Sequence, residues 1–146
     1  MKLCLMSLTI CLSLAGFAVA AEKVEPPKSC QQCGMDREAF AQSRMQIVYA
    51  DGTTVGECSL NCAVVEMKQH KEKQVKSLLV ADYRTRRLTD ARMAVWVIGG
   101  AKSGVMTTVP KWAFAVSSDA QKFVKENGGR VSTFNEALDM AVKENE

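Results

Sequence analysis

Four cysteines in two closely spaced pairs are the feature that most restricts how this chain can fold. Cys30 and Cys33 form a Cys-x2-Cys pair, and Cys58 and Cys62 form a Cys-x3-Cys pair. Two thiols this close together in a turn can bind one ion between them, and two pairs brought together by folding supply up to four sulfur ligands. The spacing therefore predicts one metal site, and a fold that places the two pairs side by side.

The ligand types favour Cu(I), with zinc as the alternative metal. Thiolate and thioether sulfurs select soft ions over hard cations, and the thioether of Met35 lies two residues after Cys33. Three other uses of the same cysteines remain open from the residues alone. They are two disulfides, a zinc ion that only stabilises the fold, and a thiol–disulfide redox pair.

The N-terminus has the pattern of a secretory signal peptide. Lys2 precedes an apolar run over residues 3–19, and a series of small residues ends at Ala20. This pattern predicts a signal peptide over residues 1–20 that is cleaved after Ala20. No cysteine follows the predicted cleavage site directly, so the pattern for lipid attachment is missing there. We therefore expect an exported protein without stable membrane insertion after cleavage.

The remainder of the chain suits a single domain. Residues 21–29 are polar and contain Pro26-Pro27, which block a helix and predict an extended linker. Residues 30–146 then form the predicted metal-binding domain, which is long enough for one hydrophobic core. The formal net charge is +3 and the basic residues are spread along the chain, which argues against a nucleic-acid partner.

The first half of the domain has the pattern of two strands, a helix and a third strand. Asp51-Gly52 between two apolar runs indicates a tight hairpin turn, and Ser59 is a good N-cap for a helix. Cys58 and Cys62 therefore bracket a helix start, where the helix dipole is expected to lower the pKa of Cys62. The predicted elements cover residues 45–49, 53–57, 60–70 and 75–80.

The second half repeats this order and adds a helix. Ser118 with Gln121, and Thr133 with Glu136, have the spacing of capping boxes at two helix starts. The predicted strands and helices cover residues 93–98, 109–116, 119–127 and 130–133, followed by an amphipathic helix over residues 134–142. The predicted fold is α+β, with two ββαβ-type units packed as one small domain and a C-terminal amphipathic helix.

The residues give no indication of an enzyme. A thioredoxin-type pair follows a strand and opens a helix, whereas Cys30 and Cys33 are preceded by Pro26-Pro27 and followed by Gly34. No histidine or aspartate is evident as the partner of a cysteine nucleophile. An exported redox protein remains the alternative in which the thiols react.

Short motifs along the chain resemble those of the NosL family. They occur in the family's order and span nearly all of the chain after the predicted signal peptide. The motifs are Cys33-Gly34-Met35, Tyr49-Ala50-Asp51-Gly52, Cys58-Ser59, Asp82-Tyr83, Asp90-Ala91, Val97-Ile98-Gly99, Met106, Ala113-Phe114, Gly128-Gly129 and Phe134-Asn135-Glu136-Ala137.

The resemblance implies a periplasmic Cu(I)-binding accessory protein, a metallochaperone, related to nitrous oxide reductase maturation. It also implies two ββαβ units and, as partner, a client copper enzyme or its maturation machinery. Met106 corresponds to a loop methionine of the family, whose thioether could bind Cu(I), although a methionine that fills a gap at a loop edge is the alternative. The candidate metal ligands are therefore Cys30, Cys33, Cys58, Cys62, Met35 and Met106.

Three features depart from the family's pattern. Typical members are lipoproteins with a lipid-bearing cysteine, whereas this chain has a plain cleavage site. The histidine often found before the paired glycines is replaced by Asn127. The two cysteine pairs also make the predicted site of this chain richer in sulfur than the family's general pattern.

Overall fold

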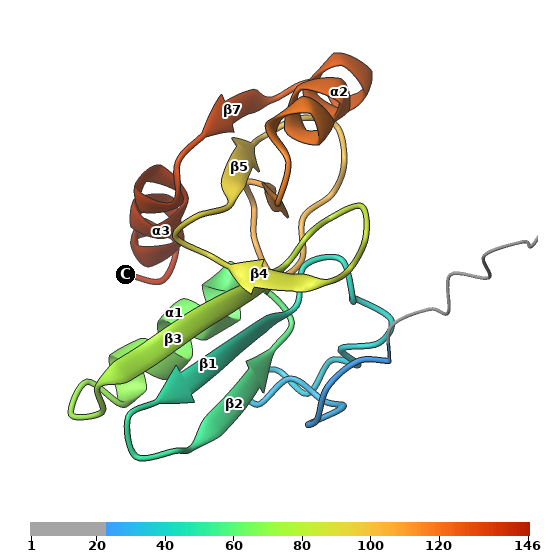
Figure 1. The fold of residues 1–146 in the computed structure, drawn as a ribbon. Coiled ribbons are helices and arrows are strands. Elements are labelled where there is room, and N and C mark those ends of the chain that lie inside the picture. Colours follow the sequence, from blue (N-terminus) through green and yellow to red (C-terminus); the bar gives the residue numbers. More distant parts are fainter. Residues whose placement is uncertain (1–22) are drawn as a thin grey trace, which may run out of the picture.

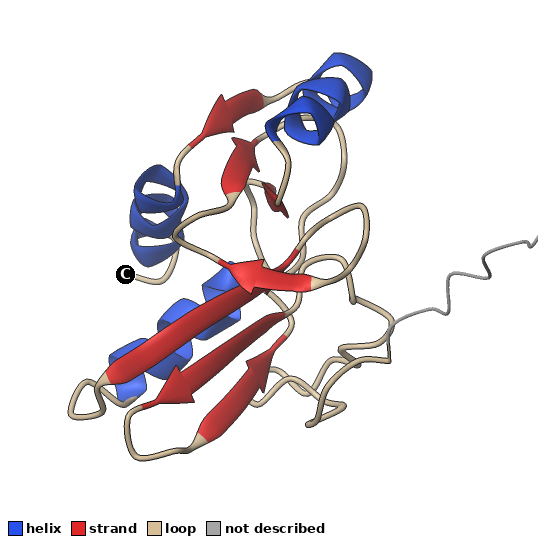
Figure 2. Ribbon diagram, viewed as in Figure 1, coloured by secondary structure: helices blue, strands red, loops and turns tan. Residues whose placement is uncertain are grey.

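A computed structural model describes residues 23–146, so the predicted signal peptide lies outside the described part of the chain. Within that part, two antiparallel sheets and three helices make up the fold (Figures 1 and 2). The first unit consists of β1 (Met45–Tyr49), β2 (Thr54–Glu57), α1 (Leu60–Gln69), β3 (Val75–Ala81) and β4 (Leu88–Asp90). The second consists of β5 (Val95–Ile98), β6 (Lys111–Phe114), α2 (Ser117–Asn127), β7 (Arg130–Ser132) and α3 (Phe134–Lys143).

The two units share one topology. The strand order is β2-β1-β3-β4 in the first sheet and β6-β5-β7 in the second. In each unit the first strand is central, the second strand pairs with one edge of it, and the third strand returns along the other edge after a helix. The predicted α+β fold of two ββαβ-type units followed by a C-terminal helix is therefore confirmed.

Two of the three predicted helix caps are present. The Ser59 hydroxyl accepts a hydrogen bond from the Cys62 N–H at 3.3 Å, and Thr133 Oγ1 accepts from the Glu136 N–H at 3.3 Å. The predicted cap by Ser118 is wrong, because α2 begins earlier and its N-cap, Val116, has no side-chain acceptor. Within residues 23–146, no helix has the length and apolar character needed to span a membrane.

The strand predicted over residues 93–98 starts later in the structure. Residues 91–94 form a turn, and Met93, the first residue of the predicted strand, is 80% exposed. The Met93 N–H donates to the Asp90 carbonyl at 3.1 Å, and the Arg92 N–H donates to Asp90 Oδ1 at 2.8 Å. These local bonds compete with a strand at Met93. The sequence also gave no indication of β4, which pairs with β3 immediately before this turn.

Two hydrophobic clusters make up the core. The larger cluster lies between the first sheet, α1 and α3, and it reaches the second sheet through Trp96, Ile98 and Ala113. Helix α3 packs against both α1 and β5, so it joins the two units (Figure 1). The smaller cluster surrounds three of the candidate thiols and contains Cys30, Cys58, Cys62, Val97, Val105, Trp112, Phe114, Ala120 and Phe123. These three thiols are therefore part of the packed interior.

Asp82 is a second connection between the two units. Its buried carboxylate accepts hydrogen bonds from the Thr85 N–H at 2.6 Å and the Thr85 hydroxyl at 2.8 Å, beyond the end of β3. It also accepts one at 2.8 Å from the N–H of Ala115, the residue after β6. Although burial alone would raise the pKa of Asp82, these hydrogen bonds keep it below its usual value.

Replacing Asp82 by asparagine is expected to lower the free energy of unfolding by about 2 kcal/mol at neutral pH, because an amide cannot accept on both sides. The native pKa of Asp82 is lowered, so its charge contributes stability above the unfolded-state pKa, and this contribution is lost as the pH falls. The difference between wild type and variant should therefore shrink below about pH 4. Urea unfolding at several pH values measures it, with the exposed Asp139→Asn as control. A difference that is constant with pH would contradict this role.

Candidate metal centre

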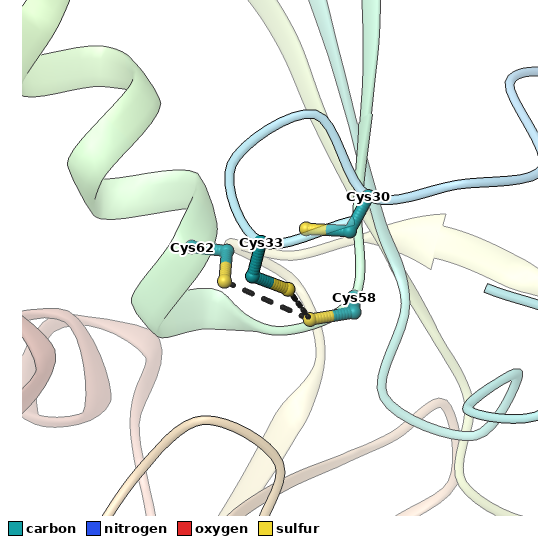
Figure 3. Close-up of side chains that lie close together, drawn as sticks. All are labelled: Cys30, Cys33, Cys58 and Cys62. Carbon is teal, nitrogen blue, oxygen red and sulfur yellow. Dashed lines mark hydrogen bonds between the residues drawn. The ribbon is translucent and has the colours of Figure 1, made fainter. Parts of the chain in front are cut away.

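The fold brings the four cysteines of the two pairs together. Their Sγ atoms all lie within 4.8 Å of one another, and the sulfurs point toward a common centre (Figure 3). Cys58 is central in this group, because its sulfur lies 3.5 Å from that of Cys33 and 3.6 Å from that of Cys62. All four thiols are free in the structure. We call this group the thiol cluster.

Local hydrogen bonds shape the turn that carries the first pair. The Gly34 N–H donates to the Cys30 carbonyl at 2.9 Å, and the Cys30 N–H donates to the Met35 carbonyl at 2.8 Å. Gly34 has a φ of 76°, a conformation that residues with a Cβ rarely adopt. The turn therefore closes tightly enough for Cys30 and Cys33 to direct both sulfurs to one side.

The second pair is positioned by the junction of β2 and α1. Cys58 follows the last residue of β2, and Cys62 lies in the first turn of α1 (Figure 3). The Ser59 cap fixes the start of the helix, and the Ser43 hydroxyl donates to the Cys58 carbonyl at 2.8 Å. The prediction that the second pair brackets a helix start is confirmed.

Two buried arginines fix the segment that precedes the first pair. Arg37 and Arg44 both form ion pairs with the carboxylate of Glu25. Arg37 also donates to the Glu25 carbonyl at 2.9 Å and to the Glu57 carbonyl at 3.2 Å. Residues 23–29, expected as a linker, are thus fastened to the domain. This role could not be predicted, because neither arginine belongs to a recognisable local motif.

The loop of the first pair also lies closely against β2. The Gln31 N–H donates to the Gly56 carbonyl at 3.1 Å. A Cβ at position 56 would lie only 2.5 Å from Arg37 Nη1 and would clash with the guanidinium, so the position requires glycine. This close approach sets the separation between the two cysteine pairs.

The electrostatics of the thiol cluster centre on Cys30. Hydrogen bonds from the thiols of Cys58 and Cys62 stabilise its thiolate and hold the pKa of Cys30 well below its usual value. The same interaction raises the pKa of Cys58 and of Cys62, because removing a second proton would place two negative charges together. The prediction that the helix start lowers the pKa of Cys62 is therefore wrong.

A buried carboxyl group lies beside this thiolate. Glu57 Oε2 lies 2.7 Å from Cys30 Sγ, and burial, followed by the hydrogen bond with Cys30, raises the pKa of Glu57 to about 9. Glu57 is therefore protonated at neutral pH. Because the raised pKa values keep Cys58 and Cys62 protonated, binding of a soft cation by these two sulfurs must release protons.

Access to the thiol cluster is narrow. Cys30, Cys58 and Cys62 are buried, and of the four thiols only Cys33 is partly accessible. A pocket of about 160 Å³ leads to the cluster from one side. It is lined by Gln32, Cys33, Asn61, Cys62, Val65, Met106 and Asn145.

The two candidate methionines lie in different places. Met106 is 51% exposed and lines the pocket together with Cys33 and Cys62. Met35 is partly buried and packs against the smaller hydrophobic cluster, which contains Cys30, Cys58 and Cys62. The structure therefore places Met106 at the accessible side of the thiol cluster and Met35 in its hydrophobic surroundings.

Comparison with known proteins agrees with the fold. The solved chain described as "Crystal structure of the copper chaperone NosL from Shewanella denitrificans" has a TM-score of 0.61 and 22% sequence identity, and the match covers 80% of this chain and 94% of that chain. Curated protein sequences give no significant match. The NosL family model matches residues 21–142. Because this match covers most of the sequence, the chain belongs to the NosL family.

Proposed function

We propose that this protein is a periplasmic Cu(I) metallochaperone that delivers copper to a client enzyme such as nitrous oxide reductase, or to its maturation machinery. The observation that carries the proposal is the group of four thiol sulfurs within 4.8 Å of one another. The family assignment supports it, since the solved relative is described as a copper chaperone. The family is not one of enzymes, so the prediction that this chain is not an enzyme is confirmed.

The donor set favours Cu(I) over hard cations. Four sulfurs in largely apolar surroundings suit a soft, singly charged ion, and the lowered pKa of Cys30 favours a negative charge beside it. The thioether of Met106 adds a neutral soft donor at the pocket. Zinc is the alternative ion, because tetrahedral Cys4 coordination is common for structural zinc.

The arrangement of the thiols suits transfer of a bound ion to a receiving protein. Cys58 lies at the centre and contacts two other sulfurs, whereas Cys33 is the thiol that a partner can reach. A ligand of the receiving protein can therefore approach the ion through the pocket beside Cys33 and Met106. The larger hydrophobic cluster contains none of the four thiols, so most of the core does not depend on a bound ion. A metal carrier requires this, because it must stay folded after it has released its ion.

Replacing Cys58 by serine is expected to lower the Cu(I) affinity by at least about 100-fold, because the central sulfur is lost. Replacing Cys33 by serine is expected to lower the Cu(I) affinity by about tenfold, because only the accessible sulfur is lost. Competition with a chromophoric Cu(I) chelator under reducing conditions measures both affinities. Met93→Leu removes an exposed sulfur remote from the thiol cluster and is the control. Unchanged affinity and stoichiometry in Cys58→Ser would contradict a shared site. Tighter binding of zinc than of Cu(I) in the same titration would favour the structural alternative.

The metal-free protein is expected to remain folded. Chelation should leave a cooperative thermal transition, and Cu(I) should then raise the Tm, because the ion binds the native thiol cluster in preference to the unfolded chain. Circular dichroism during heating, with and without chelator, checks this under reducing conditions. An unfolded metal-free protein would instead show that metal binding drives folding, as in a structural zinc site.

Export predicts a defined mature N-terminus. Protein isolated from the periplasm should have the intact mass of a chain that begins at Ala21, because the signal pattern ends at Ala20. Mass spectrometry under non-reducing conditions measures this mass and also detects disulfides among the four thiols. A retained segment 1–20 or a lipid adduct would contradict the proposed cleavage, and two stable disulfides would favour a purely structural role for the cysteines.

A further inference from the structure

One carboxylate connects the two sides of the pocket that leads to the thiol cluster. Glu144 follows the last residue of α3, and the end of this helix lies beside α1 (Figure 1). Its carboxylate accepts a hydrogen bond from Asn61 Nδ2 at 2.7 Å, on the α1 side. On the other side it accepts from Thr107 Oγ1 and Thr108 Oγ1, both at 2.7 Å, and from the Val109 N–H at 3.0 Å.

A buried lysine completes this network. Lys111 Nζ lies 2.5 Å from Glu144 Oε2, and it donates to Thr107 Oγ1 at 2.8 Å and to the Val109 carbonyl at 3.0 Å. Lys111 is buried, so its charge requires both a counter-charge and further acceptors. Since Glu144 is neutralised by this lysine, it adds no net negative charge to the pocket.

The network joins two segments that line the pocket: the start of α1, which carries Cys62, and the loop that carries Met106. Asn61 immediately precedes Cys62, and Thr107 and Thr108 immediately follow Met106. Met106 itself has a φ of 52°, the left-handed conformation that a methionine seldom adopts. A conformation of this kind persists only where surrounding contacts fix it, and such residues cluster at functional sites. Glu144 accepts a hydrogen bond from each of the three residues that follow Met106.

We infer that Glu144 is a positioning residue that holds Met106 beside the accessible side of the thiol cluster, so that the thioether can bind the Cu(I) held there. This inference rests on the proposed function, because it assigns a role toward the same copper site. Glu144 does not itself touch the ion. It fixes the distance between the loop that carries Met106 and the helix turn that carries Cys62.

A double-mutant cycle on Glu144 and Met106 tests the inference. Met106→Leu keeps the size of the side chain and removes the sulfur, and we expect it to weaken Cu(I) binding by about tenfold. Glu144→Gln should weaken binding by a similar factor, and the double variant should bind no more weakly than either single variant. If the two losses multiply, Met106 functions without Glu144 and the inference is overturned.

Two further readouts separate positioning from a general loss of stability. X-ray absorption at the copper edge should show one sulfur scatterer fewer in Glu144→Gln than in wild type, as in Met106→Leu. Hydrogen exchange of the metal-free protein should be faster at the Val109 amide in Glu144→Gln. An unchanged number of sulfur scatterers would overturn the inference, whatever the change in Tm. Glu126→Gln, an exposed site on α2, is the matched control.

A milder variant keeps the test decisive if Glu144→Gln does not fold. Thr108→Val removes one hydrogen bond to Glu144 and leaves the Lys111 ion pair in place. It should reduce Cu(I) affinity in wild type and have no additional effect in Met106→Leu. Wild-type affinity in both Thr108→Val and Met106→Leu would overturn the inference but not the proposed function. The proposed function fails separately, if Cys58→Ser binds Cu(I) as wild type does.

Discussion

The buried guanidinium of Arg37 is the interaction on which the geometry of the thiol cluster depends. This fully buried group donates to the carbonyls of Met45, Glu57 and Glu25, so the start of β1, the end of β2 and the N-terminal segment meet at one planar donor. A buried charge is costly unless it is paired and hydrogen-bonded, and the Glu25 carboxylate supplies the counter-charge. Because Glu57 adjoins Cys58 and the N-terminal segment leads to Cys30, the guanidinium links the two cysteine pairs.

The sequence predicted the elements whose signals are local. The Ser59 cap, the hairpin strands β1 and β2, and the repeated strand order follow from residues within one turn or one alternation of each other. The nearness of the two cysteine pairs was also predictable, because closely spaced thiols suggest a shared ligand. What could not be predicted depends on contacts between distant segments. Arg37 and Glu144 look like ordinary surface residues in the sequence, and only the fold gives them their partners.

The pKa of Cys62 could not be predicted from the sequence for the same reason, because it depends on residues from distant segments. The start of a helix favours a thiolate, and that argument is sound for an isolated cysteine. In the folded chain the hydrogen bond between Cys62 and Cys30 raises the pKa of Cys62, and burial and the negative charge of the Cys30 thiolate raise it further, so these effects outweigh the helix start. The identity of the ionised thiol is thus a property of the whole thiol cluster, and it depends on Glu57 and Cys58 as much as on the helix.

The burial of the thiols distinguishes a carrier from a structural metal site more clearly than their number does. A structural zinc site closes all four ligands around the ion, whereas here one thiol stays accessible beside an exposed methionine. In the proposed carrier role, a ligand of the receiving protein would replace Cys33 first, because Cys33 is the accessible thiol. The buried Cys58 and Cys62 would hold the ion during that exchange, so it would stay bound to sulfur. The buried side of the thiol cluster would then serve retention of the ion, and the pocket side its release.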